Sequence, residues 1–279
     1  MEQRRGSRLM TERLITSLTN DTIKAVRALH MRKEREATSR FLAEGLKFIG
    51  EALDQGRAPV MLLVGQDARP HPLLDRAKAE TLKAGGQIIV VTHAILEKIS
   101  RRDNPQTVLG VFEQVYTPLD AIQPDAKPCW VALEQVRDPG NLGTIIRTAD
   151  SAGCGGVILI GDCVDPFSVE AVRATMGSVF AVTISKASRE EFLAWRAQWP
   201  GSVIGTRLDA THGYRDSPVR HPAIIMMGNE QAGLTDELAA ACDLNVKIPM
   251  RGRADSLNLA VATGVMVYAV TDAAYGSSL

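Results

Sequence analysis

The sequence predicts an α/β protein built from two domains. Its 279 residues exceed the roughly 100–150 residues of a typical single domain. Short apolar runs alternate with helix-like segments in both halves, as layered α/β folds require. Three prolines within the 12 residues 117–128 (TPLDAIQPDAKP) separate the halves. We therefore expect a first domain over residues 1–117, a linker over 118–127 and a second domain over 128–279.

The first half alternates between helical and extended patterns. Within residues 20–35, Ile23, Val26 and Leu29 recur at helical spacing, and either Asn20 or Asp21 can cap the helix. The segments that follow are predicted as strands at 41–45, 60–65, 87–91 and 107–115, with helices at 46–56 and 73–86. This order predicts a smaller α/β layer domain.

The second half repeats the alternation with more strongly apolar strands. Near-continuous apolar runs occur at 129–136, 155–161, 202–207, 223–228 and 244–249. Such runs are typical of a mostly parallel sheet covered on both faces. Helices are expected between them, around 142–152, 168–176, 188–198 and 235–241. The last segment, 256–276, is apolar nearly all round, which predicts a buried or subunit-interface helix.

Composition limits the function classes. The longest nearly apolar stretch, residues 257–270, is 14 residues long, whereas a bilayer span needs about 20. The Arg-rich N-terminus lacks the apolar core of a secretory signal. We expect a cytoplasmic protein with no membrane partner, and an organellar import segment is the minor alternative. Four scattered cysteines without CxxC spacing argue against a structural zinc site or a disulfide framework.

Charge is unevenly distributed along the chain. Although the net charge is zero, residues 1–40 hold ten Lys or Arg against five acids, a local charge of +5. A basic segment of this kind is either a solvated helix face or a surface for nucleic-acid phosphates.

Three unusual loops follow predicted strands, at residues 137–153, 229–238 and 250–260. Ligands of α/β proteins bind where the carboxyl ends of parallel strands meet. The candidate site residues in these loops carry amide, hydroxyl, carboxylate and guanidinium groups: Asn141, Arg147, Glu230, Ser256 and Asn258. Each alone is more often a cap or turn residue. Nearby glycines would let the backbone approach a ligand closely, namely Gly140, Gly143, Gly228, Gly233 and Gly252.

The residues in these loops argue against nucleotide hydrolysis, dinucleotide binding and metal catalysis. Residues 228–235 have the spacing of a P-loop, but Leu234 stands at the position of the phosphate-binding lysine. No GxGxxG follows a predicted strand, so a dinucleotide fingerprint is absent. None of the five histidines lies in the loops or at metal-ligand spacing, and we expect no metal. The remaining groups suit a substrate that brings its own reactive group.

The same loops carry a family resemblance. DPGNLGTIIRTADSAG, IIMMGNEQAGLTDEL and IPMRGRADSLNLAVATGVMVYA resemble, in order and spacing, the three motifs of the SpoU/TrmH RNA 2′-O-ribose methyltransferases of the SPOUT superfamily. One departure is Thr175, where serine is commoner in the family. EGLKFIGEAL and NPQTVLGVFE in the first half are similar to the RNA substrate-binding domain that often precedes this unit. The resemblance runs from about residue 11 to 275.

The resemblance implies a fold, a cofactor and partners. It implies a C-terminal parallel-sheet trefoil-knot (SPOUT) domain preceded by a smaller α/β/α sandwich RNA-binding domain, with homodimerisation through the C-terminal domain. S-adenosyl-L-methionine would bind in the knot, held by the backbone at Gly228, Ile248 and Leu257. The implied catalytic residues are Asn141 and Arg147 from motif 1, Glu230 from motif 2, and Ser256 and Asn258 from motif 3.

The mechanism and the target stay open at this point. Arg147 could take the proton of the ribose hydroxyl, although a guanidinium is a poor base, or it could remain charged and stabilise a developing alkoxide. In the family that the sequence resembles, an N-terminal accessory domain of this kind favours ribosomal RNA over transfer RNA as the target. The alternatives are a base methyltransferase of the same superfamily and a non-catalytic protein of RNA binding or ribosome assembly.

Overall fold

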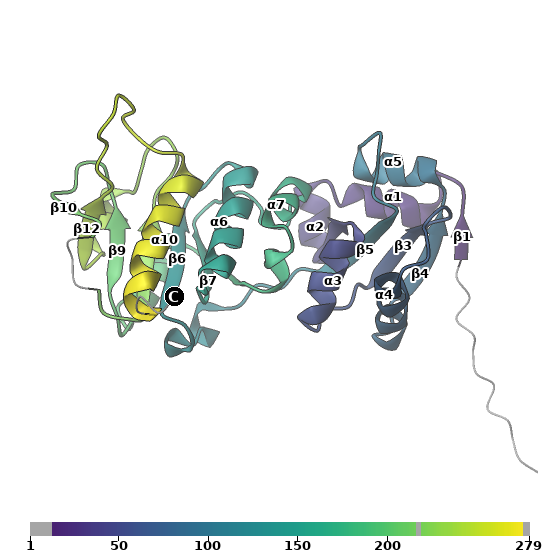
Figure 1. Cartoon of the computed structure of the whole chain (residues 1–279), viewed down its shortest axis with the longest axis horizontal. Coiled ribbons are helices and arrows are strands. Elements are labelled where there is room, and N and C mark those ends of the chain that lie inside the picture. Colours follow the sequence, from purple (N-terminus) through teal and green to yellow (C-terminus); the bar gives the residue numbers. More distant parts are fainter. Residues whose placement is uncertain (1–12, 216–218, 276–279) are drawn as a thin grey trace, which may run out of the picture. The chain divides into compact units, whose positions relative to one another are not determined.

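The computed structural model describes residues 13–215 and 219–275 and divides into two compact units between Gln114 and Val115 (Figure 1). Arg4, Arg5 and Arg8 of the basic N-terminal segment lie outside the described residues. Over the described residues, no helix is long and apolar enough to cross a membrane.

The first unit is a sheet covered by helices, as predicted. Its described strands pair in the order β1-β4-β3-β5-β2, with β1, β4 and β3 parallel and β5 antiparallel to both neighbours. Helices α1 and α5 contact each other, and so do α3 and α4. The elements are β1 (Arg13–Ile15), α1 (Asp21–Ala28), α2 (Arg32–Thr38), β2 (Arg40–Glu44), α3 (Leu46–Asp54), β3 (Met61–Gly65), α4 (Pro72–Lys83), β4 (Gln87–Val91), α5 (His93–Ser100) and β5 (Val108–Glu113).

The single helix expected over residues 20–35 is wrong, because α1 ends at Ala28 and α2 begins only at Arg32. Asn20 does cap α1, since its side chain accepts a hydrogen bond from the Thr22 amide. The break is stabilised by Arg35, which is 3% exposed. Its guanidinium donates to the carbonyls of Leu29 and His30 at 2.8 and 2.9 Å, and so satisfies groups that a continuous helix would have bonded internally.

The second unit confirms the predicted parallel sheet. Its described strands pair in the order β10-β12-β9-β11-β6-β7-β8, and every pairing is parallel. The elements are β6 (Cys129–Glu134), α6 (Pro139–Ser151), β7 (Gly156–Ile160), α7 (Val169–Thr175), β8 (Thr183–Ala187), α8 (Arg189–Arg196), β9 (Val203–Thr206), β10 (His212–Gly213), β11 (Ala223–Met227), α9 (Asp236–Ala240), β12 (Leu244–Lys247) and α10 (Leu259–Tyr275).

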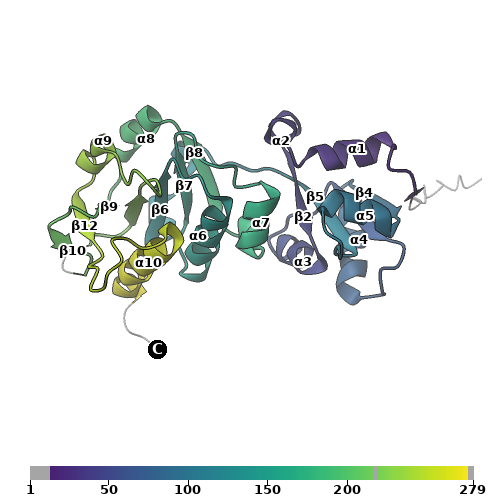
Figure 2. The same cartoon turned by 90° about the horizontal axis from the view of Figure 1, so that it is seen from above.

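The strand order creates a switch point at the centre of this sheet. From β6 the chain runs outward through β7 to β8, and then crosses over to build β9, β11 and β12 on the other side. Strands β6 and β11 are therefore neighbours whose following loops lead in opposite directions. Figure 2 shows α6 and α10 on one face of the sheet and α8 and α9 on the other. In open parallel sheets, ligands bind outside the carboxyl ends of the strands at such a switch point.

The proline-rich segment belongs to the second unit. The Thr117 amide donates to the Ile184 carbonyl at 2.9 Å, and short 3-10 turns cover Leu119–Ala121 and Pro124–Ala126. Ile122 is buried in the same core cluster as Trp130 and Trp199. Residues 118–127 are therefore packed onto the sheet rather than extended between the units.

Helix α10 is apolar but only half buried. Thr263, Met266, Val267 and Val270 face the core, and the helix contacts α6, β6 and β11. On another face Val261, Tyr268 and Tyr275 are 53%, 47% and 54% exposed. The helix thus leaves an apolar stripe in solvent.

Candidate functional site

A pocket opens at the carboxyl ends of β9, β11 and β12, beside the switch point. Its volume is about 280 Å³, and its walls come from residues 206–208, 227–233 and 248–262. Gly228, Ile248 and Leu257, the residues that the resemblance assigns to the cofactor, all line it, and so do Glu230 and Ser256. Three sequence-distant loops therefore converge on one cavity.

The loop from Gly228 to Thr235 closes on itself. The Asn229 and Gly233 amides each donate to the other residue's carbonyl, at 3.0 and 2.9 Å. The Asn229 Oδ1 accepts from the amides of Gln231 and Ala232. A Cβ at Gly228 would lie 2.0 Å from the Gly233 carbonyl carbon and 2.0 Å from the Leu234 nitrogen, so only glycine fits there.

Leu234 stands where a P-loop carries its phosphate-binding lysine. Its side chain is 5% exposed and belongs to the hydrophobic core of the second unit. The position that holds the lysine in a P-loop is here an anchor that ties the loop to the core.

Glu230 joins the loop after β11 to the loop after β6. Its carboxylate accepts hydrogen bonds from the Arg137 and Asp138 amides, each at 3.2 Å, and from the Asn141 Nδ2 at 3.4 Å. Charged acceptors make stronger bonds to backbone amides than neutral ones. Glu230 therefore fixes the relative position of motifs 1 and 2.

Asn141 extends this connection to motif 3. It lies in the first turn of α6, where Asp138 caps the helix by accepting from the Asn141 amide. The Asn141 Oδ1 accepts from the Asn258 Nδ2 at 2.9 Å. Asn258 in turn accepts from the Ala260 and Val261 amides at the start of α10. The structure thus brings Glu230, Asn141 and Asn258 into one hydrogen-bonded chain.

Ser256 and Arg147 are placed differently. Ser256 is exposed at the pocket and donates to the Asp255 Oδ1 at 3.4 Å. Arg147 is exposed on α6, more than a turn beyond Asn141, and among the described residues it is not part of the pocket lining. Within one protomer, therefore, the structure brings together all the candidate residues except Arg147.

Gly143 has a packing role that the sequence did not reveal. A Cβ there would lie 2.3 Å from the Ala171 carbonyl oxygen and 2.5 Å from the Ala174 Cβ. The expectation that Gly143 lets backbone approach a ligand is therefore wrong, because its missing side chain lets α6 approach α7.

The charge of the pocket favours a cationic ligand over a polyphosphate. Glu230 and Asp255 contribute carboxylates to the lining. The one guanidinium in the described lining, that of Arg207, is bonded to Asp209 and Asp236 at 2.6 to 2.8 Å. These hydrogen bonds raise the pKa of Arg207 and lower that of Asp209. No group of three or more His, Cys, Asp or Glu is placed to hold a metal ion among the described residues.

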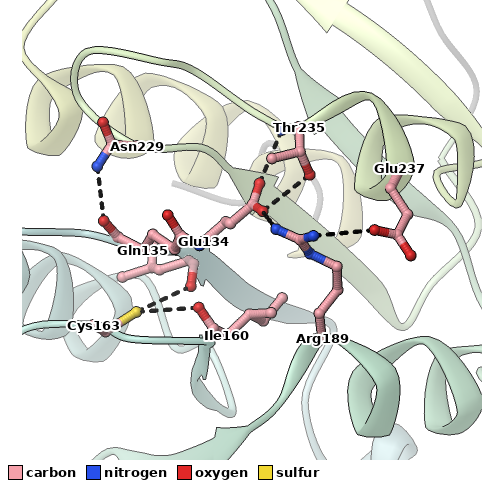
Figure 3. A network of polar contacts seen from close by, with 9 residues as sticks. Glu134, Gln135, Ile160, Cys163, Arg189, Asn229, Thr235 and Glu237 are labelled. Atoms are coloured by element: carbon pink, nitrogen blue, oxygen red, sulfur yellow. Dashed lines mark hydrogen bonds and ion pairs between the residues drawn. The ribbon is translucent and has the colours of Figure 1, made fainter.

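Sequence reasoning missed a polar network directly behind the loop (Figure 3). Glu134, the last residue of β6, is 1% exposed. Its carboxylate pairs with Arg189 at 3.0 Å and accepts from the Thr235 amide and hydroxyl, both at 2.9 Å. The available signal was one acidic residue at the end of the otherwise apolar strand CWVALE.

The family models that match the chain cover both units. Residues 128–268 match the SpoU rRNA Methylase family, which is 141 of the 279 residues, and residues 20–110 match the MRM3-like substrate binding domain. These matches confirm the predicted family and its N-terminal accessory domain.

Similar proteins extend over nearly the whole chain. A 23S rRNA (guanosine(2553)-2′-O)-methyltransferase, RlmP, of Bacillus subtilis is 30% identical over 91% of this chain and 97% of its own. A 23S rRNA (uridine(2479)-2′-O)-methyltransferase of Streptomyces viridochromogenes is 30% identical over 96% of this chain and 95% of its own.

Solved structures agree with these relatives. An AdoMet-bound rRNA methyltransferase from Sinorhizobium meliloti is 46% identical with a TM-score of 0.88, covering 95% of this chain and 99% of its own. The SpoU methyltransferase AviRb from Streptomyces viridochromogenes, in complex with AdoMet, is 27% identical with a TM-score of 0.82, covering 92% of this chain and 99% of its own. With motifs, fold and near-full-length relatives in agreement, this protein belongs to the SpoU rRNA methylase family.

Proposed function

We propose that this protein methylates a ribose 2′-hydroxyl of ribosomal RNA and takes the methyl group from S-adenosylmethionine. The observation that carries the proposal is a pocket beside the sheet's switch point whose lining residue Glu230 is hydrogen-bonded to Asn141 and, through Asn141, to Asn258. The names of the relatives, which are 23S rRNA 2′-O-methyltransferases, support the same reaction.

The pocket fits this cofactor in charge and shape. Met227, Ile248 and Leu257 offer apolar walls for an adenine ring, and Gly228 lines the same cavity. The carboxylates of Glu230 and Asp255 suit a positively charged ligand. When bound, the cofactor supplies an electrophilic methyl group on a cationic sulfur.

The residues of the site divide into positioning and substrate-facing groups. Glu230, Asn141 and Asn258 use side-chain atoms on one another and on backbone amides, so we assign them to holding the three motifs in register. Ser256 has hydroxyl capacity beyond its long bond to Asp255, and we assign it to orienting the ribose. In-line transfer requires the hydroxyl oxygen to be held about 3 Å from the methyl carbon.

A homodimer would account for Arg147. The exposed residues Val261, Tyr268 and Tyr275 on α10 are spaced by seven, which makes one apolar stripe along the helix. Helix α6, which carries Arg147, packs beside α10. We propose that two copies pair through this surface, so that Arg147 of one protomer serves the pocket of its partner and stabilises the developing alkoxide there.

Mixing two inactive variants tests this arrangement. Arg147→Ala lacks the guanidinium, and Gly228→Val lacks a usable pocket. In a mixed dimer, the Arg147→Ala protomer contributes an intact pocket and the Gly228→Val protomer contributes Arg147. Random re-pairing should therefore restore about a quarter of the wild-type sites. If each Arg147 served its own protomer, the mixture would stay as inactive as its components.

A second cavity lies beside the pocket. It has a volume of about 480 Å³, shares Ile248 with the cofactor pocket, and is lined by Tyr214, Arg215 and Arg251. Aromatic rings stack on unpaired bases, and guanidinium groups bind phosphates. We propose that nucleotides flanking the target ribose lie here, with further RNA on the first unit.

The product distinguishes ribose from base methylation. A methylated 2′-oxygen can no longer attack the adjacent phosphate, so an alkaline ladder of ribosomal RNA treated with protein and cofactor should show one new gap. Transfer RNA serves as the competing substrate, and Arg147→Ala as the inactive control. Methyl label without a gap would indicate base methylation, and cofactor binding without transfer to any RNA would indicate a binding protein. We place the activity in the cytoplasm, where the ribosomal substrate would be met.

A further inference from the structure

Glu134 is a buried charge whose partners come from distant parts of the second unit. Its carboxylate side chain is 2% exposed, and that of Arg189, at the start of α8, is 31% exposed. Thr235, which precedes α9, supplies the two other donors to Glu134. Burying a charge costs several kcal/mol before pairing, and apolar replacements of buried ion pairs are often no less stable. Stability alone is therefore a weak account of Glu134.

The network fixes both ends of the loop that walls the pocket. At its far end, the amide and hydroxyl of Thr235 donate to Glu134 at 2.9 Å. At its near end, Asn229 Nδ2 donates to the carbonyl of Gln135 at 2.8 Å. Gln135 follows Glu134 directly and has a φ of 49°, a left-handed conformation that non-glycine residues adopt rarely. Both attachments therefore depend on one dipeptide at the end of β6.

The Thr235 hydroxyl is committed to this contact. Thr235 is the N-cap residue of α9, yet its side chain makes no capping hydrogen bond to that helix. Its hydroxyl instead donates to the Glu134 Oε1, which also accepts a hydrogen bond from the Arg189 Nη2. A threonine at an N-cap usually accepts from the helix backbone, so the loop end is oriented by Glu134 rather than by its own helix.

We propose that Glu134, held by Arg189, is a positioning residue for the cofactor pocket. It is not among the described residues that line the pocket. It acts by holding residues 228–235 in the shape that presents Gly228 and Glu230 to the ligand. The inference rests on the proposed function only in taking S-adenosylmethionine as the ligand of this pocket.

Asp243 offers a matched control. Its carboxylate pairs with Arg196 at 2.6 Å and accepts from the Val203 amide at 2.7 Å, which repeats the chemistry of Glu134. It lies at the opposite end of the sheet, where β9 begins. Asp243→Asn therefore removes the charge from an ion pair away from the pocket loop; the Asp243 side chain is 40% exposed, against 2% for Glu134. Glu237→Gln removes the exposed second partner of Arg189, 3.1 Å away.

The main experiment compares Glu134→Gln with both controls in the full chain. S-adenosylmethionine affinity is measured by calorimetry, and amide exchange of residues 228–236 is measured without cofactor, with residues 156–160 of β7 as internal reference. Glu134→Gln should weaken binding about ten- to a hundredfold, the loss expected for charged hydrogen bonds. It should also speed exchange in 228–236 while leaving β7 unchanged. Asp243→Asn and Glu237→Gln should change neither measurement by more than about twofold.

A milder pair keeps the test decisive if Glu134→Gln fails to fold. Thr235→Val removes one hydroxyl bond and keeps the ion pair, so it should weaken cofactor binding about fivefold, and Thr235→Ser should restore it. Wild-type affinity and exchange in Glu134→Gln, or in Thr235→Val, would overturn the inference. Equal loosening of 228–236 by Asp243→Asn would overturn it too. If the wild-type chain binds no S-adenosylmethionine, the proposed function fails, whereas the exchange comparison still decides the role of Glu134.

Discussion

Replacing Gly228 by alanine tests whether the closed conformation of the pocket loop determines how tightly the cofactor binds. The added Cβ would lie 2.0 Å from both the Gly233 carbonyl carbon and the Leu234 nitrogen, and 2.3 Å from the Gly233 oxygen. Real Cβ contacts are essentially never below 3.0 Å, so the backbone must separate by about 1 Å. The loop cannot yield easily, because Leu234 is anchored in the core and Asn229 bonds to Gly233.

The expected magnitude follows from that displacement. Overpacking of a fitted site costs roughly 1–3 kcal/mol in the free energy of unfolding, which for a chain of this size lowers the melting temperature by a few degrees. A cost of the same 1–3 kcal/mol in the free energy of cofactor binding corresponds to a loss of affinity of up to about a hundredfold. We therefore expect Gly228→Ala to lose up to about a hundredfold in S-adenosylmethionine affinity while remaining folded at 25 °C.

Gly252→Ala is the control for this substitution. It makes the same chemical change in the motif 3 loop, but nothing lies within 4 Å of the new Cβ, and φ is not in the left-handed region. Calorimetric titration with the cofactor and thermal melts of both variants provide the comparison. If Gly228→Ala bound S-adenosylmethionine as tightly as Gly252→Ala, the closed loop would not be what shapes the pocket.

Three further outcomes follow from the structure. Gly143→Ala should lower the free energy of unfolding by roughly 1–3 kcal/mol through its clash with Ala171, and denaturant melts would show this, while cofactor affinity stays unchanged. Glu230→Gln keeps the side-chain shape but weakens the bonds to the Arg137 and Asp138 amides; initial-rate measurements should show at least a tenfold lower kcat/KM. Burial raises the pKa of Cys242 to about 12. Iodoacetamide at pH 8 should therefore label this thiol only after unfolding, and labelling of Cys242 in the native chain would contradict this expectation.

The sequence predicted the elements that carry a strong local pattern. The continuous apolar strands of the second unit were predicted correctly, and Asn20, one of the two residues offered as the cap, is the N-cap of α1. Strand β8 was missed because it is the sheet's edge strand and mixes apolar residues with Thr183, Ser185 and Lys186. Helix α5 and the short strands β1 and β10 were missed as well. The break at residue 29 was not predicted, because it depends on bonds made by Arg35 after folding.

The candidate site was only partly predictable for the same reason. Loop chemistry and motif resemblance together selected eight residues, and five of those eight, Gly228, Glu230, Ile248, Ser256 and Leu257, line one pocket. Local pattern could not show that Asn141 bonds to Asn258, since 117 positions separate them. Nor could it show that Glu134 and Thr235 meet across 101 positions. Such contacts form because the order of strands in the sheet brings distant segments together, and the sequence of one segment does not determine that order.

The switch point separates the two parts of the proposed active site along the sheet. The pocket proposed for the cofactor is built by loops that follow β9, β11 and β12, whereas Asn141 and Arg147 belong to α6, which follows β6. Besides the backbone pairing of β6 with β11, the side chains of Glu230 and Asn258 join these two parts. Under the proposed assignments, the ribose-orienting Ser256 and the cavity of Tyr214, Arg215 and Arg251 lie on the side of the methyl-donor pocket. Changes on α6 would therefore alter the chemistry at the acceptor oxygen, whereas new RNA targets would require changes beside the donor site itself.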